Sequence, residues 1–424
     1  MVFTVVIADD ITGANDIGVM YAKSGLDTVV YSLDKLEEDF VPVHQVTVID
    51  TNSRFCTPEE AYKRVYSITK RIGPRGAVQF IDKQCSVFRG NIGAEFDAML
   101  DALGEKHGMV VLAFPDNGRT TVNGIHYVYG VRLEDSQFRN DPVHPMRQSS
   151  LVDILSAQTK RRVALVPAAV LDQGREALLQ EIERRKKEAS YLIFDARDNA
   201  DLELLAQVLK DEPVICGSSA PGFYLGRLYA REKGIVPPVG ENRSGDEKIL
   251  SIAGSLTPQT RAQTEYMKKQ GYPVLTLDTR RLFEEDTRQA EEERILKEYA
   301  KAHDRSRITL IHSLQDEELV RETKEAAARK GLTNTEVSEA VSRQLAELAC
   351  IIGEKYSIRK YMICGGDTSG AFCDRFHIRG VKVLEEIEPG LPVCRSITEP
   401  YYELVLKSGS FGSESFLETA AGYL

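Results

Sequence analysis

The sequence predicts an α/β protein with two domains, each a mostly parallel sheet flanked by helices, with the active site in the interdomain cleft. Three observations lead to this prediction. Short apolar segments alternate with longer amphipathic ones, as in buried parallel strands connected by helices. The chain has 424 residues, which is long for a single hydrophobic core. The segment GIVPPVGENRSGDEK, residues 234–248, breaks the alternation near the middle of the chain.

We expect domains over residues 1–235 and 248–424, joined by a linker over 236–247. The first domain has strand candidates at Thr4–Ala8, Gln45–Ile49, Ala77–Ile81, Met109–Ala113, Val163–Val166, Tyr191–Phe194 and Pro213–Cys216. The second has strand candidates at Ile249–Ala253, Val274–Leu277, Ile308–Ile311 and Met362–Cys364. Helices are predicted at Glu59–Ile72, Ala94–Leu103 and Asn334–Glu354. The last is the clearest, because its apolar residues recur every three or four positions.

Composition excludes several classes of function. The formal net charge is −10, and the basic residues are spread along the chain, so binding to nucleic acid or to an anionic membrane is not expected. No apolar run approaches the roughly 20 residues that span a bilayer. The first residues, MVFTVVIADD, read as a core strand of a cytoplasmic protein and not as a signal peptide. Seven cysteines without a CxxC pair indicate neither disulfides nor a zinc site.

Polar residues follow the first four strand candidates, where ligands bind in open parallel sheets. They are Asp9 and Asp10 after the first strand, Arg54 after the second, Lys83, Ser86, Arg89 and Asn91 after the third, and Arg119 and Thr120 after the fourth. Basic side chains bind carboxylates or phosphates, and an aspartate can accept a proton or coordinate Mg²⁺. We therefore expect a small polar ligand with an anionic end. The alternative is that each aspartate caps a helix and each base forms a surface ion pair.

Three loops of the second domain are rich in glycine and hydroxyl side chains. They are GSLTPQT (254–260), GGDTSGAF (365–372) and KSGSFGSES (407–415). Glycine lets backbone N–H groups approach phosphate oxygens, and a helix starting at about Thr368 would point its positive end at the same anion. Neither GxxxxGK[ST] nor GxGxxG after a strand occurs. Together the two domains suit phosphoryl transfer from a nucleotide to a hydroxyl group.

The motifs resemble those of the four-carbon acid sugar kinases, which phosphorylate tetronates such as D-threonate, erythronate and 3-oxo-tetronate with ATP. The resemblance runs nearly end to end, through ADDITGAND, DKQCSVFRGNIGAE, FPDNGRTTVNG, CGSSAPGFYLG, AGSLTPQTRAQ, CGGDTSGAF and KSGSFGSESF. It implies that the first domain binds the sugar acid through Asp9 or Asp10, Arg54, Lys83, Ser86 and Arg89. It also implies that the second binds ATP through Ser255, Gly365, Gly366, Asp367, Thr368, Ser369 and Gly409.

The chain departs from the family pattern at one position, and one segment implies a particular substrate. Cys85 stands where the family commonly has aspartate. Segment 139–148, RNDPVHPMRQ, is similar to the D-threonate kinase branch, which implies formation of 4-phospho-D-threonate. Alternatives are another tetronate, D-erythronate or 3-oxo-tetronate, or a sugar-acid sensor without catalysis. A phosphatase with an aspartate nucleophile is a further alternative, but the adjacent carboxylates do not have the spacing of that signature. A homodimer is an additional expectation.

For some residues the sequence leaves two roles open. We favour Asp10 over Asp9 as the base that accepts the proton of the substrate hydroxyl, although the sequence alone does not decide between them. Asp367 is expected either to coordinate Mg²⁺ or to cap the following helix with Thr368. His126 and His144 are expected to be hydrogen-bonded loop histidines without a catalytic role.

Overall fold

The computed structural model describes residues 2–73, 77–141, 143–236 and 245–424. The chain forms two compact units, residues 1–238 and 239–424, called unit 1 and unit 2 below. Most of the predicted linker, from residue 237 to 244, lies outside the described residues. Within the described ranges, no helix combines the length and the hydropathy needed to cross a bilayer.

Unit 1 is built on a sheet whose neighbouring strands run parallel. In spatial order the strands are β2 (Thr28–Ser32), β3 (Val46–Asp50), β1 (Thr4–Ala8), β4 (Gln79–Lys83), β11 (Val214–Gly217), β5 (Gly108–Val111), β10 (Tyr191–Phe194) and β9 (Val163–Val166). Every residue of β1, β3 and β4 is buried. The carboxyl ends of these three strands carry Asp9, Arg54 and Lys83 to one edge of the sheet.

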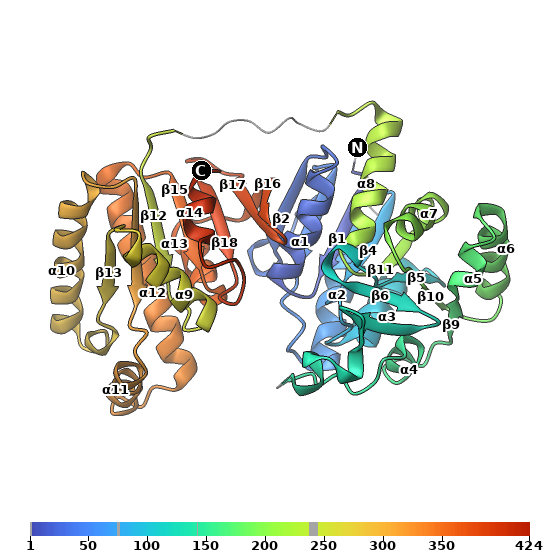
Figure 1. The fold of residues 1–424 in the computed structure, drawn as a ribbon, viewed down its shortest axis with the longest axis horizontal. Coiled ribbons are helices and arrows are strands. Elements are labelled where there is room, and N and C mark those ends of the chain that lie inside the picture. The colour runs from blue at the N-terminus through green and yellow to red at the C-terminus, as the bar shows by residue number, and fades with distance from the viewer. Residues whose placement is uncertain (1, 74–76, 142, 237–244) are drawn as a thin grey trace. The chain divides into compact units, whose positions relative to one another are not determined.

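Helices cover both faces of this sheet (Figure 1). They are α1 (Ile11–Ala22), α2 (Pro58–Ile72), α3 (Ile92–Leu103), α4 (Leu151–Ser156), α5 (Ala168–Leu171), α6 (Arg175–Lys186), α7 (Asn199–Leu209) and α8 (Ala220–Lys233). On one face α1 packs against α8, and on the other α2 packs against α3. Val65 and Phe96 from the second pair share a hydrophobic core with Val5 and Ile7 of β1. A small antiparallel sheet contains β6 (Arg119–Val122), β7 (Ile125–Val128) and β8 (Val131–Arg132).

Unit 2 has a mixed sheet. Its strands, in spatial order, are β13 (Val274–Leu277), β14 (Ile308–Ser313), β12 (Ile249–Ala253), β15 (Lys360–Cys364), β18 (Glu403–Lys407), β17 (Leu391–Ser396) and β16 (Gly380–Glu388). The strands from β13 to β18 run parallel, and β17 and β16 are antiparallel to their neighbours. The predicted fold class, two mostly parallel α/β domains, is therefore confirmed.

The helices of unit 2 are α9 (Pro258–Lys269), α10 (Glu285–His303), α11 (Glu317–Ala328), α12 (Asn334–Tyr356), α13 (Gly366–Arg375) and α14 (Phe416–Ala421). Met267 of α9 and Phe416 of α14 share a core with Ile249 and Leu310 of the sheet. The long helix α12 packs against α13 and begins with a capping box between Thr333 and Glu336, so its sequence signal and its structure agree.

Candidate active site

Asp9 and Asp10 follow β1 directly. Asp10 has an extended backbone (φ −151°, ψ 160°) and is the N-cap of α1, where its carboxylate accepts the N–H of Gly13 at 2.7 Å. The Asp9 side chain is fully buried, whereas 22% of the Asp10 side chain is exposed. Asp10 is therefore the carboxylate of the pair that a ligand can reach.

The guanidinium of Arg54 binds both carboxylates. Nε and Nη2 donate to the two oxygens of Asp9 at 2.7 and 2.8 Å, while Nη2 also donates to Asp10 Oδ1 at 2.8 Å and Nη1 donates to Asp10 Oδ2. The loop after β3 fixes this arrangement, because the N–H groups of Ser53 and Arg54 donate to the Asp9 carbonyl at 3.0 and 3.1 Å. Most donors of Arg54 face the two aspartates, which leaves little capacity for direct substrate binding.

Lys83, the last residue of β4, lies beside the same aspartates. Its Nζ donates to the Gln84 carbonyl at 2.8 Å, and the residue is buried. A Cβ built on Gly13 would lie 2.9 Å from Lys83 Nζ, 2.7 Å from Asp10 Oδ1 and 3.7 Å from Asp9 Oδ1. The absence of a side chain at Gly13 thus allows the ammonium and both carboxylates to meet at the start of α1.

A buried carboxyl network lies behind this cluster. Gln84 Nε2 donates to Asp82 Oδ1 at 2.7 Å and to Glu95 Oε2 at 2.9 Å, and Ser53 Oγ donates to Glu95 Oε1 at 3.0 Å. Burial raises the pKa of Asp82 to about 8 and holds the pKa of Glu95 well above its ordinary value. Both carboxyl groups therefore favour the neutral form near pH 7.

Burial also shifts the pKa of two carboxyl groups nearer the ligand-facing edge. It raises the pKa of Asp50, at the end of β3, to about 7. The pKa of Asp9 is also raised by burial, although Arg54 and Lys83 act against the increase and Asp10 adds to it. Both groups are buried, so these shifts belong to the surroundings of Asp10 and not to the carboxylate that a ligand can reach.

Arg89 is held on three sides. Its Nη1 donates to Asp141 Oδ2 at 2.5 Å, its Nε donates to Cys85 Sγ at 3.3 Å, and the guanidinium lies over the Phe138 ring, 5.5 Å from the centroid. Asp141 is itself held by the N–H of His144, which donates to Oδ1 at 2.7 Å. The guanidinium of Arg89 is therefore fixed in orientation before any ligand binds.

Both histidines form structural contacts, but only His144 is a loop residue, because His126 lies in β7. His144 Nε2 lies 3.0 Å from the Arg54 carbonyl, and its ring stacks on the Phe55 ring with 5.8 Å between centroids. His126 Nε2 lies 2.9 Å from the Ser86 carbonyl, and burial lowers the pKa of His126 to about 4. His126 is therefore neutral at pH 7 and serves as a hydrogen-bonding group between β7 and the loop that carries Ser86.

The other predicted substrate residues have diverse surroundings. Asn91 Nδ2 donates to the carbonyls of Ser53 and Cys56, both at 3.0 Å, so Asn91 supports the loop that carries Arg54. Ser86 is half-buried beside the Lys83 loop. Arg119 lies on the small sheet, where Nη1 donates to the Asn117 carbonyl and the guanidinium lies 5.0 Å from the Tyr129 centroid. The structure thus brings Arg54 and Lys83 to the aspartates, while Arg119 interacts with its own loop and sheet.

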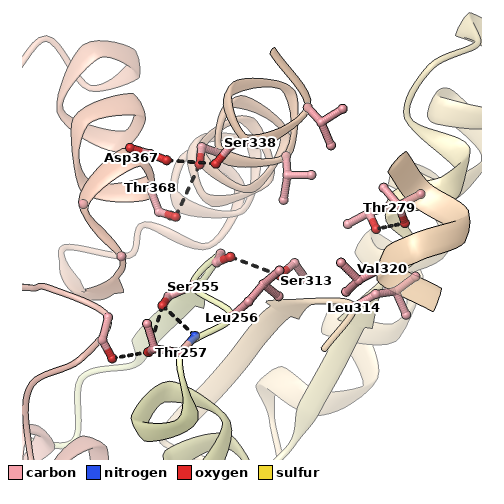
Figure 2. A pocket seen from close by; sticks show the side chains of 18 of the residues that line it. Ser255, Leu256, Thr257, Thr279, Ser313, Leu314, Val320, Ser338, Asp367 and Thr368 are labelled. Atoms are coloured by element: carbon pink, nitrogen blue, oxygen red, sulfur yellow. Dashed lines mark hydrogen bonds between the residues drawn. The ribbon is translucent and has the colours of Figure 1, made fainter. Parts of the chain in front are cut away.

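Unit 2 has a cavity of about 480 Å³ at the carboxyl ends of its parallel strands (Figure 2). The glycine-rich loops after β12, β15 and β18 line one part of it, including Ser255, Gly365, Gly366 and Gly409. Figure 2 shows Thr279, Leu314 and Val320 together at another end, apart from Asp367 and Thr368. The cavity therefore combines a polar end with backbone N–H donors and an end with apolar side chains.

Close packing of Gly409 and hydroxyl groups shapes the polar end. Thr257 Oγ1 donates to the Gly409 carbonyl at 2.6 Å and lies 3.1 Å from Ser255 Oγ. A Cβ built on Gly409 would lie 2.0 Å from Ser255 Oγ, so no larger residue fits there without displacing that hydroxyl. Three of the residues that the sequence associates with ATP, Ser255, Gly365 and Gly409, thus come together.

Helix α13 begins two residues earlier than predicted, at Gly366 with Gly365 as N-cap. Gly365 has φ 126°, which favours glycine, and this conformation lets the helix start directly after β15. Asp367 therefore lies inside the first turn and does not cap the helix, and its Oδ2 accepts the Ser338 hydroxyl at 2.8 Å. Thr368 and Ser369 are buried in the same turn, and the Thr368 hydroxyl lies 3.5 Å from Ser342 Oγ.

Four acidic residues of unit 1 take part in these networks without having been predicted from the sequence: Asp50, Asp82, Glu95 and Asp141. Asp50 and Asp82 begin the polar segments DTNSR and DKQCSVFRGN, and Glu95 ends a motif used for the family resemblance. Acidic residues in such motifs are a signal of a functional site, but the sequence does not show that they are buried, because burial depends on how the elements pack. Asp141 lies in segment 139–148. Its contact with Arg89 joins residues that are 52 positions apart, so it depends on the tertiary fold.

Two family models match this chain, one in each unit. A family model described as a sugar-binding N-terminal domain matches residues 4–224, and one described as a nucleotide-binding C-terminal domain matches residues 250–417. The chain therefore combines two domains of families described as sugar-binding and nucleotide-binding.

Relatives of known name extend over the whole chain. A 3-oxo-tetronate kinase from Pectobacterium atrosepticum is 32% identical and covers 98% of this chain and 97% of its own. A D-erythronate kinase from Heliobacterium modesticaldum is 29% identical, with 99% and 96% covered. The chain belongs to the four-carbon acid sugar kinases, and its activity is therefore phosphoryl transfer to a hydroxyl of a four-carbon acid sugar.

Solved structures show the same fold. A protein from Salmonella typhimurium LT2 superimposes with a TM-score of 0.84 at 30% identity, with 99% of both chains covered. A protein from Haemophilus influenzae has a TM-score of 0.78 at 28% identity, covering 99% of this chain and 100% of its own.

Proposed function

We propose that the protein transfers the γ-phosphoryl group of ATP to a hydroxyl of a four-carbon sugar acid bound by unit 1. The observation that carries this proposal is the accessible carboxylate of Asp10, supported by Arg54 and Lys83 at the end of a parallel strand. Such a group can accept a proton from a hydroxyl, while the adjacent cations make the site tolerant of an anionic substrate.

Asp10 is the proposed base, because its side chain is partly exposed and that of Asp9 is not. Asp10 takes the proton as the hydroxyl oxygen forms its bond to the γ-phosphorus and the bond from that phosphorus to ADP breaks. Asp9 and Arg54 hold Asp10 in position through their shared hydrogen bonds. Lys83 and Arg89 bind the carboxylate of the acid, with Ser86, Asn91 and Arg119 as further proposed substrate contacts.

The proposed ATP contacts are Ser255, Gly409 and the turn formed by Gly365, Gly366, Asp367, Thr368 and Ser369. Backbone N–H groups of that turn and the start of α13 suit phosphate oxygens. Among the described residues, no cluster of three or more His, Cys, Asp or Glu side chains is suited to a metal ion. Mg²⁺ commonly binds one or two carboxylates together with substrate phosphates, so the lone carboxylate of Asp367 fits it. When bound, Mg²⁺ neutralises phosphate charge during the transfer.

D-threonate, giving 4-phospho-D-threonate, is the substrate that segment 139–148 favours. The named relatives favour 3-oxo-tetronate or D-erythronate instead. The discriminating experiment is a coupled assay of ADP release with D- and L-threonate, D- and L-erythronate and their 3-oxo forms. Absence of turnover with all of these acids would contradict the kinase assignment and favour a sugar-acid sensor. A homodimer and a cytoplasmic location remain predictions.

The role of Asp10 is tested with Asp10→Asn. Asparagine is as good an N-cap as aspartate, so this variant keeps the helix start and removes the base. We expect kcat to fall by about 10²–10⁴-fold, the usual contribution of a general base. Asp198→Asn is a matched control, because Asp198 caps α7 by accepting the N–H of Asp201 at 3.0 Å and lies outside the site. If both Asp10→Asn and Asp9→Asn retain wild-type kcat, neither aspartate is the base.

A further inference from the structure

Lys407 is a buried cation of unit 2 that has no role in the mechanism above. It is the last residue of β18, and only 2% of its surface is exposed. Its Nζ donates to the Ser408 carbonyl at 3.1 Å and to the Thr260 hydroxyl at 3.4 Å. Both acceptors are neutral, and no carboxylate among the described residues forms an ion pair with this ammonium.

An unpaired charge in a protein interior is costly, so buried lysines normally have an acidic partner. Lys360 of the same sheet follows this rule. It is also buried, and its ammonium lies 2.7 Å from Glu247 and 3.7 Å from Glu403. Lys407 lacks such a carboxylate among the described residues, so its charge is available to stabilise an anion bound nearby.

The contacts of Lys407 place its charge behind the polar end of the cavity. Ser408, whose carbonyl accepts from the ammonium, lines the cavity together with Gly409. The Thr260 hydroxyl accepts from the ammonium and donates to the Gly409 carbonyl at 2.8 Å. The carbonyl of Lys407 accepts the N–H of Gly365 at 2.9 Å. Lys407 therefore joins two of the glycine-rich loops, and its charge lies behind them.

The cavity itself contains little positive charge for a polyphosphate. Two charged side chains of the described residues line it, those of Lys324 and Asp367, and Asp367 is negative. Lys324 belongs to the apolar end, because the preceding residue, Thr323, is hydrogen-bonded to Thr279 there. The starts of α9 and α13 contribute partial positive charge. We propose that Lys407 supplies the fixed positive charge that binds the polyphosphate of ATP in this cavity, as a positioning residue acting through Ser408 and Gly409. This inference rests on the proposed use of ATP.

The test compares Lys407→Met with the wild-type full chain by isothermal titration with ADP and with adenosine. We expect the Kd for ADP to rise at least tenfold, while the Kd for adenosine, which has no phosphate, stays within twofold. Urea unfolding without ligand should show a variant at least as stable as the wild type, because an unpaired buried charge has been removed. Lys360→Met is the matched control and should do the opposite, losing stability while binding ADP normally.

Three results would overturn the inference: an unchanged Kd for ADP in Lys407→Met, a parallel loss of ADP and adenosine binding, or a less stable variant. Each of these would assign Lys407 to the structure of the sheet. A wild-type protein that binds no ADP would instead contradict the proposed function, so the two failures are distinguishable.

Discussion

Replacing Arg54 with methionine should destabilise unit 1 more than any surface substitution. Arg54 is 7% exposed and forms four hydrogen bonds to the carboxylates of Asp9 and Asp10. Methionine preserves much of the apolar stem but removes the charge. The Arg54→Met variant would therefore leave the buried carboxylate of Asp9 with Lys83 as its remaining nearby cation.

The size of the effect follows from this burial. Removing one partner of a buried ion pair costs about 3–5 kcal/mol, because the remaining charge is left without compensation. A domain is stabilised by about 5–15 kcal/mol in total, so the loss is a large fraction of the stability of unit 1. Adding Asp9→Asn to Arg54→Met removes the uncompensated charge and should recover at least about 1 kcal/mol of the loss.

The chain contains no tryptophan, so urea unfolding is best followed by far-UV circular dichroism. Hydrogen exchange with mass spectrometry then separates the two units. Peptides from β1, β3 and β4 should lose protection, while peptides from β12 and β15 should keep it. Arg184→Met is a matched control, since Arg184 also binds two carboxylates, those of Glu181 and Glu188, but on the exposed surface of α6.

The control should change the free energy of unfolding by less than about 1 kcal/mol, as is typical of exposed ion pairs. The reasoning is refuted if Arg54→Met loses no more stability than this control. It is also refuted if Asp9→Asn deepens the loss in the double variant, because that would show that the carboxylate of Asp9 is not left uncompensated.

Two further predictions concern the neighbouring carboxyl groups. Asp141→Asn should raise the KM for the sugar acid about tenfold with little change in kcat, since Arg89 loses the charged partner that orients it; an unchanged KM in steady-state kinetics would contradict this role. The raised pKa values of Asp50 (about 7) and Asp82 (about 8) mean that the folded state holds their protons more tightly than the unfolded state. The free energy of unfolding of unit 1 should therefore fall as pH rises from about 4 to about 8, and Asp82→Asn should flatten this dependence in urea titrations.

The sequence predicted the buried parallel strands well, for a physical reason. Such strands are covered on both faces and read as apolar runs, so Thr4–Ala8 and Ile249–Ala253 have the bounds expected. The antiparallel strands at one side of unit 2 were not predicted. β16 contains GVKVLEEIE and β17 contains a proline, and neither resembles a continuous apolar run. β2 and β18, two short apolar segments that run parallel to a neighbouring strand, were missed as well.

The candidate site shows a similar limit. The rule that ligands bind at the carboxyl ends of parallel strands was sufficient to select the loops that contain Asp10 and Lys83. The loop that contains Gly409 was selected by its glycine and hydroxyl content, because the strand before it was not predicted. The rule does not predict the hydrogen-bond partners of such residues, because hydrogen bonds such as that from Arg54 to Asp9 or from Arg89 to Asp141 depend on long-range packing. The burial that raises the pKa of Asp82 likewise arises only when the sheet is complete.

The position of β11 in unit 1 has a consequence for biosynthesis. This strand is the last of unit 1 along the chain, yet it lies in the middle of the sheet between β4 and β5, with Cys216 beside Asp82 and Gly217 beside Lys83. A ribosome must synthesise the chain as far as residue 217 before those strands gain their shared neighbour. Until then the edges of β4 and β5 are open, and open edges promote aggregation of nascent chains. The strand that carries Lys83 is thus completed late, and a chain truncated before β11 lacks the support on which the substrate site is built.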